Sequence, residues 1–105
     1  MSKYQIAKEE FNNLLKEEGV VIADFSSPYC APCKKIPPVF EEVEQIIDSK
    51  AKFIEINVAD ENELALEHDV FSVPTIIIFK NGEEKERHTG VINSKKLNSM
   101  INNHL

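Results

Sequence analysis

The chain has 105 residues, of which 42% are hydrophobic and 29% charged, and its formal net charge is −6. This length predicts one domain, covering residues 1–105, with one hydrophobic core of a size that is usual for a soluble protein. The negative charge argues against nonspecific binding to nucleic acid or to an anionic membrane surface, and no apolar run is long enough to span a bilayer.

The N-terminal residues lack the apolar stretch of a signal peptide, so we expect a cytoplasmic protein unless a leader preceded this numbering. The chain contains two cysteines, Cys30 and Cys33. In a cytosolic chain such a pair more often serves catalysis or metal binding than structural stabilisation.

The first quarter of the chain predicts a short strand, a helix and a buried strand. Residues 3–6 have the pattern of a short strand. From Lys8 to Glu18 apolar residues recur at helical spacing, and Gly19 is well placed to end that helix. Residues 20–25 form an apolar run interrupted only by Asp24, which is typical of a strand buried on both faces.

A second, longer helix is expected to follow the two cysteines and to reach about Ser49. Pro32 suits its first turn, where the missing N–H removes no helical hydrogen bond. Pro37 and Pro38 lie further along, so we expect them to kink the helix. Alternating apolar residues over 53–58 then predict the next strand.

The second half of the chain predicts a short helix over residues 61–68 and an apolar strand over 75–79. Asn81-Gly82 is a strong hairpin signal, and residues 83–89 form a charged edge strand. Ser94 is expected to cap a last helix, whose apolar face consists of Leu97, Met100, Ile101 and Leu105.

This order of elements predicts an α/β fold with a mixed central sheet and helices on both faces. The short helices between strands imply right-handed parallel crossovers, and the hairpin adds antiparallel strands at one side.

The two cysteines are expected to carry the chemistry. Placed at the start of a helix, Cys30 would lie near free backbone N–H groups and the positive end of the helix dipole, which favour a thiolate. We therefore assign Cys30 the attack on a substrate disulfide, and the more buried Cys33 the attack on the resulting mixed disulfide. Lys34 and Lys35 add at most a modest attraction and otherwise form a solvated helix face.

Two other interpretations of the cysteine pair remain open, namely half of a zinc site and an inert local disulfide. Tetrahedral zinc requires two further ligands, and His68, His88 and His104 are scattered along the chain without a ligand pattern. We expect these histidines to be surface residues and favour the redox interpretation.

Three further features converge on one family. Val73-Pro74-Thr75 precedes a strand, Asp24 interrupts a buried strand, and Phe79-Lys80-Asn81-Gly82 forms the hairpin. Together with Tyr-Cys-Ala-Pro-Cys-Lys over residues 29–34, they make the chain resemble the thioredoxin family over essentially its whole length. The resemblance implies a thioredoxin fold, with a mixed central sheet of about five strands flanked by about four helices.

The resemblance also implies the parts of a site. The proline that matches Pro74 is cis and lies against the cysteines, although a trans proline at a strand start is the alternative from the residues alone. The glycine that matches Gly90 borders the binding surface, and the proline that matches Pro38 kinks the long helix. The resemblance also implies a substrate-binding rim around the cysteines. Its residues are Tyr29, Ala31, Pro32, Val73, Pro74, Val91 and Phe71.

The function implied by the resemblance is the reduction of protein disulfides by a dithiol that a thioredoxin reductase-type flavoprotein regenerates. The dithiol itself carries the two electrons, so no bound cofactor or metal is expected. The expected partners are that flavoprotein and disulfide-containing client proteins, and we expect a monomer. Two alternatives remain: a redox donor for a narrow set of clients, and a non-catalytic interaction module, against which the two cysteines near Pro74 argue.

Some residues depart from the family pattern. Ala31 replaces the usual glycine between the cysteines, and Tyr29 and Ser26 stand where tryptophans are usual. These changes are expected to alter redox poise or partner fit without abolishing disulfide exchange.

Glu55 is the sharpest departure, because a lysine paired with the buried acid is usual at this position. If Asp24 and Glu55 approach each other, two carboxylates share an apolar region, and we expect one to stay protonated near neutral pH. Asp24 would then exchange a proton with Cys33. The alternatives are that Glu55 points outward and that Asp24 is a purely structural acid.

Overall fold

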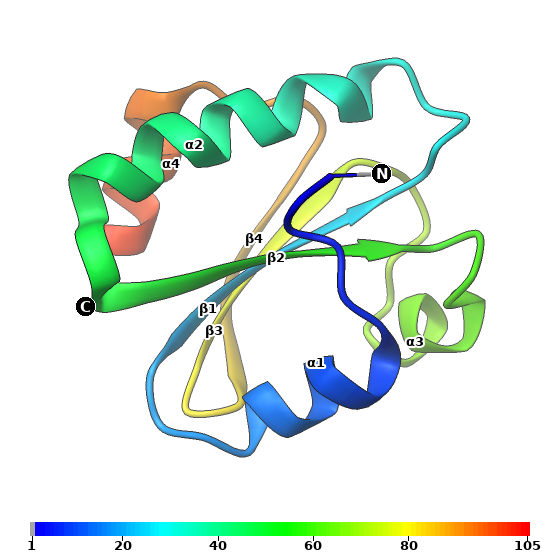
Figure 1. Cartoon of the computed structure of the whole chain (residues 1–105), viewed down its shortest axis with the longest axis horizontal. Coiled ribbons are helices and arrows are strands. Elements are labelled where there is room, and N and C mark those ends of the chain that lie inside the picture. The colour runs from blue at the N-terminus through cyan, green and yellow to red at the C-terminus, as the bar shows by residue number, and fades with distance from the viewer. Residues whose placement is uncertain (1) are drawn as a thin grey trace.

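A computed structural model describes residues 2–105 and contains a four-stranded mixed sheet (Figure 1). The strand order is β2-β1-β3-β4. β1 pairs in parallel with β2 and antiparallel with β3, which pairs antiparallel with β4. The strand bounds are β1 Val20–Ser26, β2 Ala51–Asn57, β3 Thr75–Lys80 and β4 Glu83–Thr89.

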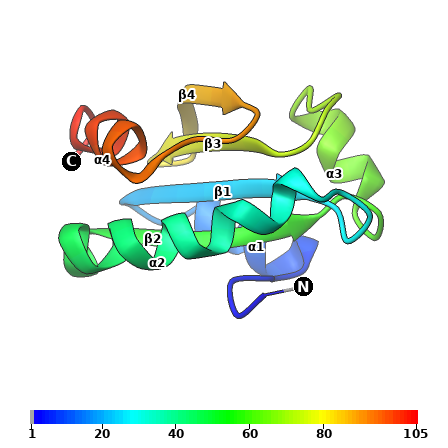
Figure 2. The same cartoon turned by 90° about the horizontal axis from the view of Figure 1, so that it is seen from above.

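The α-helices cover both faces of this sheet, with α2 and α4 on one side and α1 and α3 on the other (Figures 1 and 2). Two short 3₁₀ helices, η1 and η2, flank α2. Across residues 2–105, no helix is both long and apolar enough to cross a membrane. The helix bounds are α1 Lys8–Leu15, η1 Pro32–Lys35, α2 Ile36–Ile47, η2 Asp48–Lys50, α3 Asn62–Glu67 and α4 Ser94–Asn102.

The core has one apolar cluster on each face of the sheet, because successive strand side chains point to opposite faces. Val20 and Ile22 of β1 pack with α2 and α4, whereas Val21 and Ala23 pack with α1 and α3. Every residue of β1 is buried, as its apolar run predicts for a strand covered on both faces.

The expected number of about five strands is wrong by one, because residues 3–6 do not form a full strand. Lys3 and Tyr4 form a turn, and the segment pairs with β2 only at a parallel bridge between Gln5 and Glu55. The Glu55 amide donates to the Tyr4 carbonyl at 2.9 Å, and the Ile6 amide donates to the Glu55 carbonyl at 3.0 Å. The N-terminal segment is therefore attached to β2 at Glu55.

The crossover through α2 is parallel as expected, but the connection through α3 is not, since β3 runs antiparallel to β1. The connection from β2 to β3 contains the short helix α3, and β3 starts at the edge where β1 and β2 end.

Two helices begin or end away from their expected bounds. α1 ends at Leu15, four residues before Gly19, whose φ of +126° lies in the loop that follows. The chain after the cysteines starts as 3₁₀ and becomes α-helical only at Ile36. Pro37 and Pro38 therefore lie in the first turn of α2, where proline is tolerated, rather than at a kink within it.

The cap of α4 was also predicted wrongly. Asn93 is the capping residue, and its side-chain oxygen accepts from the Lys96 amide at 2.8 Å. Ser94 instead donates its hydroxyl to Glu42 on α2 at 2.7 Å, linking the two helices. Leu105 is 44% exposed and does not join the buried face of α4.

The expectation of surface histidines is wrong for His68, whereas His88 and His104 keep partly exposed side chains. His68 lies among aromatic rings, with its centroid 5.5 Å from Phe11, 6.0 Å from Phe25 and 5.5 Å from Phe79. This burial lowers the pKa of His68 below its ordinary value.

Because the His68 pKa is lowered on folding, the unfolded chain binds the proton more tightly, and stability falls as pH drops below about 6.5. We expect His68→Phe to gain stability relative to wild type as pH is lowered from 7.5 to 5.5. Urea unfolding at both pH values measures this, with His88→Gln as the control for loss of another imidazole. An equal difference at both pH values would contradict the prediction.

The hairpin turn packs against the end of α1, and Gly82 is the residue that permits this. Its φ is +83°, and an added Cβ would overlap the backbone oxygen of Leu15. We expect Gly82→Ala to lower the free energy of unfolding by about 2–4 kcal/mol, combining backbone strain with overpacking.

Gly19→Ala is the matched control for Gly82→Ala, since Gly19 also has positive φ but an added Cβ meets open space. Urea denaturation of both variants separates the two effects. Equal losses would show that backbone strain alone matters and that the Leu15 contact does not.

Candidate active site

The candidate site lies where β1 and β2 end and β3 begins. Ser26 and Asn57 are partners in the β1–β2 register, and Thr75 pairs with Phe25 beside them. The Val58 amide donates to the Ser26 carbonyl at 2.8 Å, which holds the two strand ends together. The loop that leaves β1 at this edge carries the cysteines.

Cys30 and Cys33 form a disulfide in this structure. Cys33 lies in η1 and is 2% exposed, whereas Cys30 precedes η1 and is partly exposed. The Cys33 amide donates to Cys30 Sγ at 3.3 Å. After reduction, an amide in this position would stabilise negative charge on the Cys30 sulfur. The lower exposure of Cys33 than of Cys30 confirms the predicted difference between the two cysteines.

A second loop lies against the cysteine pair. The Val73-Pro74 peptide bond is cis, as the resemblance implied. The Val73 carbonyl oxygen lies 3.8 Å from Cys30 Sγ. The Gly90 amide donates to the Pro74 carbonyl at 2.8 Å, so the loop after β4 is joined to the same place. Three segments distant in the sequence thus meet at Cys30.

The residues expected to form a binding rim differ in exposure. Tyr29 and Phe71 are 89% and 80% exposed, large values for aromatic side chains. Val91, Ala31 and Pro32 are also exposed, Val73 and Gly90 are partly buried, and Pro74 is buried. The open apolar surface is therefore carried mainly by the loops on either side of Cys30, while Pro74 lies beneath it.

Asp24 is buried in β1, with 1% of its surface exposed. Burial, and then the charge of Glu55, raise the pKa of Asp24 to about 8. Its Oδ1 atom has no hydrogen-bond partner within residues 2–105. A carboxyl with this pKa holds its proton over much of the neutral range and can still release it.

Glu55 does not point outward, so that alternative is wrong. It is 2% exposed and is the register partner of Asp24 across the β1–β2 pair. The Ser2 hydroxyl donates to Glu55 Oε1 at 2.7 Å. The sequence left open whether Asp24 and Glu55 approach each other. In the structure they are buried neighbours.

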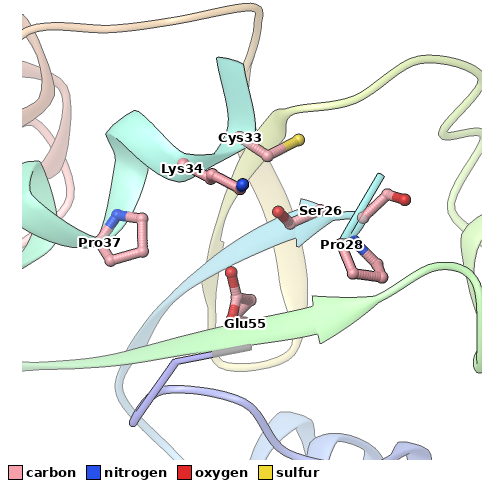
Figure 3. Close-up of a pocket in the computed structure, with 7 residues that line it drawn as sticks. Ser26, Pro28, Cys33, Lys34, Pro37 and Glu55 are labelled. Carbon is pink, nitrogen blue, oxygen red and sulfur yellow. The ribbon is translucent and has the colours of Figure 1, made fainter. Parts of the chain in front are cut away.

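A pocket of about 210 Å³ opens beside Cys33 (Figure 3). In that view Cys33 and Lys34 lie above it on η1, and Ser26 and Glu55 point toward it from the strands. The residues that line the pocket are Ser26, Ser27, Pro28, Cys33, Lys34, Pro37 and Glu55.

Sequence reasoning missed the place of Ser26 and Lys34 in this pocket. Ser26 is fully buried, and its hydroxyl has no hydrogen-bond partner in the described chain. The alternation of strand side chains was the available signal, because Ser26 is two residues after Asp24 and shares its face. Lys34 was taken as part of a solvated face, yet its ammonium points into the pocket in Figure 3.

The described residues 2–105 contain no group of three or more His, Cys, Asp or Glu side chains arranged to hold a metal ion. The three histidines make other contacts. His88 Nε2 lies 3.1 Å from the Val91 carbonyl, and His104 Nε2 lies 2.6 Å from Glu86 Oε2. The His68 ring lies among phenylalanines, and none of these histidine contacts involves a cysteine.

The chain matches known proteins along nearly its whole length. The Thioredoxin family model matches residues 2–103. A thioredoxin of Bacillus subtilis is 42% identical over 88 residues, covering 84% of this chain and 85% of that protein. A thioredoxin of Staphylococcus epidermidis is 32% identical over 105 residues and covers 100% of both chains.

The solved structure of a mutant thioredoxin from Halobacterium salinarum superposes with a TM-score of 0.86 at 28% identity, covering 95% of this chain and 88% of that one. The sequence matches, the fold match and the Cys30–Cys33 disulfide therefore point to the same family. On these grounds the chain belongs to the thioredoxin family and is a thiol–disulfide oxidoreductase.

Proposed function

We propose that the reduced chain reduces protein disulfides through Cys30 as the attacking residue. The Cys30 thiolate attacks one sulfur of the substrate disulfide, a Cys30–substrate bond forms, and the substrate S–S bond breaks. The other substrate sulfur leaves as a thiolate and takes a proton from solvent. The partial exposure of Cys30 and the Cys33 amide donated to its sulfur support this assignment.

Cys33 completes the reaction. The Asp24 carboxylate accepts the Cys33 proton, and the Cys33 thiolate attacks Cys30 Sγ. The bond between Cys30 and substrate breaks, the second substrate sulfur leaves as a thiolate and is protonated, and the Cys30–Cys33 disulfide forms. In total the dithiol loses two electrons and the substrate disulfide gains two. The burial of Cys33 supports its role as the resolving residue, because substrate reaches Cys30 first.

Substrate binding is assigned to the surface around Cys30. The exposed Tyr29, Phe71 and Val91 offer apolar contacts, and the backbone at Val73, next to buried Pro74, faces the attacked bond. An extended client segment could pair with this backbone while its side chains contact the rim. Ala31, Pro32 and Gly90 complete the surface on either side.

The remaining assignments follow from the family. We place the chain in the cytoplasm as a monomeric electron carrier, with a thioredoxin reductase-type flavoprotein as its electron donor and disulfide-containing proteins as clients. The exposed Tyr29 and Ala31 differ from the usual residues, which permits a narrower client set as the second candidate function. Retention of both cysteines beside Pro74 weighs against a non-catalytic interaction module.

The observation that carries the proposal is the placement of a partly exposed Cys30 against the Val73 carbonyl, with a buried Cys33 as its disulfide partner. An insulin-reduction assay with dithiothreitol tests it, and we expect clear acceleration over dithiothreitol alone. Absence of acceleration by the folded protein would defeat the reductase proposal. Redox equilibration against a reference dithiol adds a second check, since a strongly oxidising potential would favour disulfide formation instead.

A further inference from the structure

The pairing of Asp24 with Glu55 carries an inference that deepens the proposed function and rests on it. The two residues are partners in a parallel register, so their side chains leave the same face of strands about 4.8 Å apart. They are 1% and 2% exposed. Two carboxylates at this spacing and depth cannot both ionise cheaply, so the pair retains one proton where an exposed carboxyl would have none.

Few other charges face this pair. Cys33 and Lys34 of η1 border the pocket, and the N-terminal segment contributes the Ser2 hydroxyl on Glu55. Tyr4 of the same segment directs its hydroxyl to Glu44 on α2 at 2.8 Å. Residues packed on this side from the neighbouring elements are apolar, namely Ile36 and Phe40 of α2 and Ile76 of β3. Lys34 is thus the one cation beside the pair among the described residues that line the pocket.

The two carboxyls differ in their access to solvent. Glu55 lines the pocket beside Cys33, whereas Asp24 is not among the lining residues (Figure 3). The pocket volume of about 210 Å³ has room for water, and the Ser26 hydroxyl in its wall is free to bond to it. Glu55 therefore offers a proton on Asp24 a polar route to solvent through this pocket.

We propose that Glu55 shares a proton with Asp24 and relays it between that pair and solvent through the pocket beside Cys33. When the shared proton lies on Glu55, the Asp24 carboxylate accepts the Cys33 proton as Cys33 attacks Cys30. Glu55 then releases its proton to solvent through the pocket, and the proton on Asp24 is again shared by the pair. One proton enters the pair from the thiol and one leaves to solvent, so the pair returns to its starting state. Glu55 touches neither sulfur and acts through Asp24, as a positioning and relay residue.

A purely structural role for Glu55 is the competing explanation. Its backbone binds Tyr4 and Ile6, and its carboxyl accepts from Ser2, so it also fastens the N-terminal segment to β2. Loss of that role would change stability. It would not make the reaction depend on added small acids, so that dependence separates the two explanations.

The first test is carboxyl ¹³C NMR of the reduced protein. In wild type, we expect the Asp24 signal to titrate in two steps, because it also responds to the charge on its neighbour Glu55. In Glu55→Gln, the Asp24 midpoint is expected to fall by about 1 pH unit or more, because a like charge has been removed. Glu63→Gln is the control, since it removes an exposed carboxylate on the opposite face of the sheet.

The second test follows the relay. In weakly buffered solution near pH 7, we expect Glu55→Gln to reduce a disulfide peptide about 10-fold or more slowly than wild type, within the usual range for a lost proton-transfer group. Formate is small enough for the pocket and should restore the rate toward that of wild type. Glu63→Gln should match wild type with and without formate.

A one-step titration of Asp24 in wild type, with no response to a neighbouring carboxyl, would overturn the inference without requiring any variant to fold. A slow Glu55→Gln variant that formate does not restore would overturn the relay. Neither result would affect the proposed reductase function as long as wild-type protein accelerates insulin reduction. Failure of wild type in that assay would instead remove the proposed function itself.

Discussion

Cys33→Ser is expected to accumulate a stable mixed disulfide with a disulfide substrate, while multiple-turnover reduction falls to the rate of the reductant alone. A serine hydroxyl cannot displace the substrate sulfur from Cys30, so the reaction stops after its first half. Non-reducing electrophoresis and mass spectrometry with insulin as substrate would detect one covalently attached insulin chain. Reduction with dithiothreitol should release it.

Cys30→Ser is the matched control, because it changes the same atom in the partner cysteine. Cys33 is 2% exposed, so the remaining thiol is poorly placed to reach a protein disulfide. We expect no adduct and no turnover. Equal adduct formation by the two variants would contradict the assignment of Cys30 as the attacking residue. Applied to a cell extract, the Cys33→Ser variant would also distinguish a broad client set from a narrow one.

Asp24→Asn is expected to raise the free energy of unfolding of the oxidised protein, and to raise it more as pH increases. Folding raises the pKa of Asp24 from 3.8 to about 8, so the folded state favours the protonated carboxyl. The stability that Asp24 contributes is therefore fully present below about pH 4 and is lost progressively as pH rises to about 8. The asparagine side chain does not ionise in this range, so the variant lacks the fall in stability that wild type shows as pH rises.

The magnitude of the Asp24→Asn effect can be bounded. At about 1.36 kcal/mol per pKa unit, the shift corresponds to at most about 6 kcal/mol above pH 8. A buried amide with unpaired groups costs about 1–3 kcal/mol in return, so we expect a net gain of about 3 kcal/mol at pH 9. Urea unfolding of the oxidised protein from pH 5 to pH 9 measures it.

Asp48→Asn is the control for Asp24→Asn, since it makes the same chemical change at an exposed residue. Its stability difference from wild type should vary little with pH. If the Asp24→Asn difference were equally flat, the carboxyl would be ionised at the same pH in the folded and unfolded states, and its role as proton acceptor for Cys33 would lose its physical basis.

Local patterns were sufficient to predict most of the elements. The apolar run over residues 20–25 predicted a strand covered on both faces, and Asn81-Gly82 predicted the hairpin between β3 and β4. The resemblance to the thioredoxin family added the cis bond before Pro74. These features depend on neighbours in the sequence or on family-specific residues, so no knowledge of packing was needed.

Boundaries and direction were less predictable, because they depend on competition between distant groups. Asn93 rather than Ser94 caps α4, since the Ser94 hydroxyl is used by Glu42 on another helix. β3 enters the sheet antiparallel to β1, a direction that the pattern of elements did not predict. A residue pattern shows that a helix or strand forms, but not which partner its polar atoms will find.

By itself, the sequence determined the chemistry of this protein: a Cys30–Cys33 pair before a helix, Pro74 before a strand and an acid, Asp24, within a buried one. Only the tertiary structure decided what surrounds these groups. It placed Glu55 beside Asp24 through the β1–β2 register and opened a pocket between Glu55 and Cys33. Burial and proximity are properties of packed elements, and they set the electrostatics that a linear pattern cannot express.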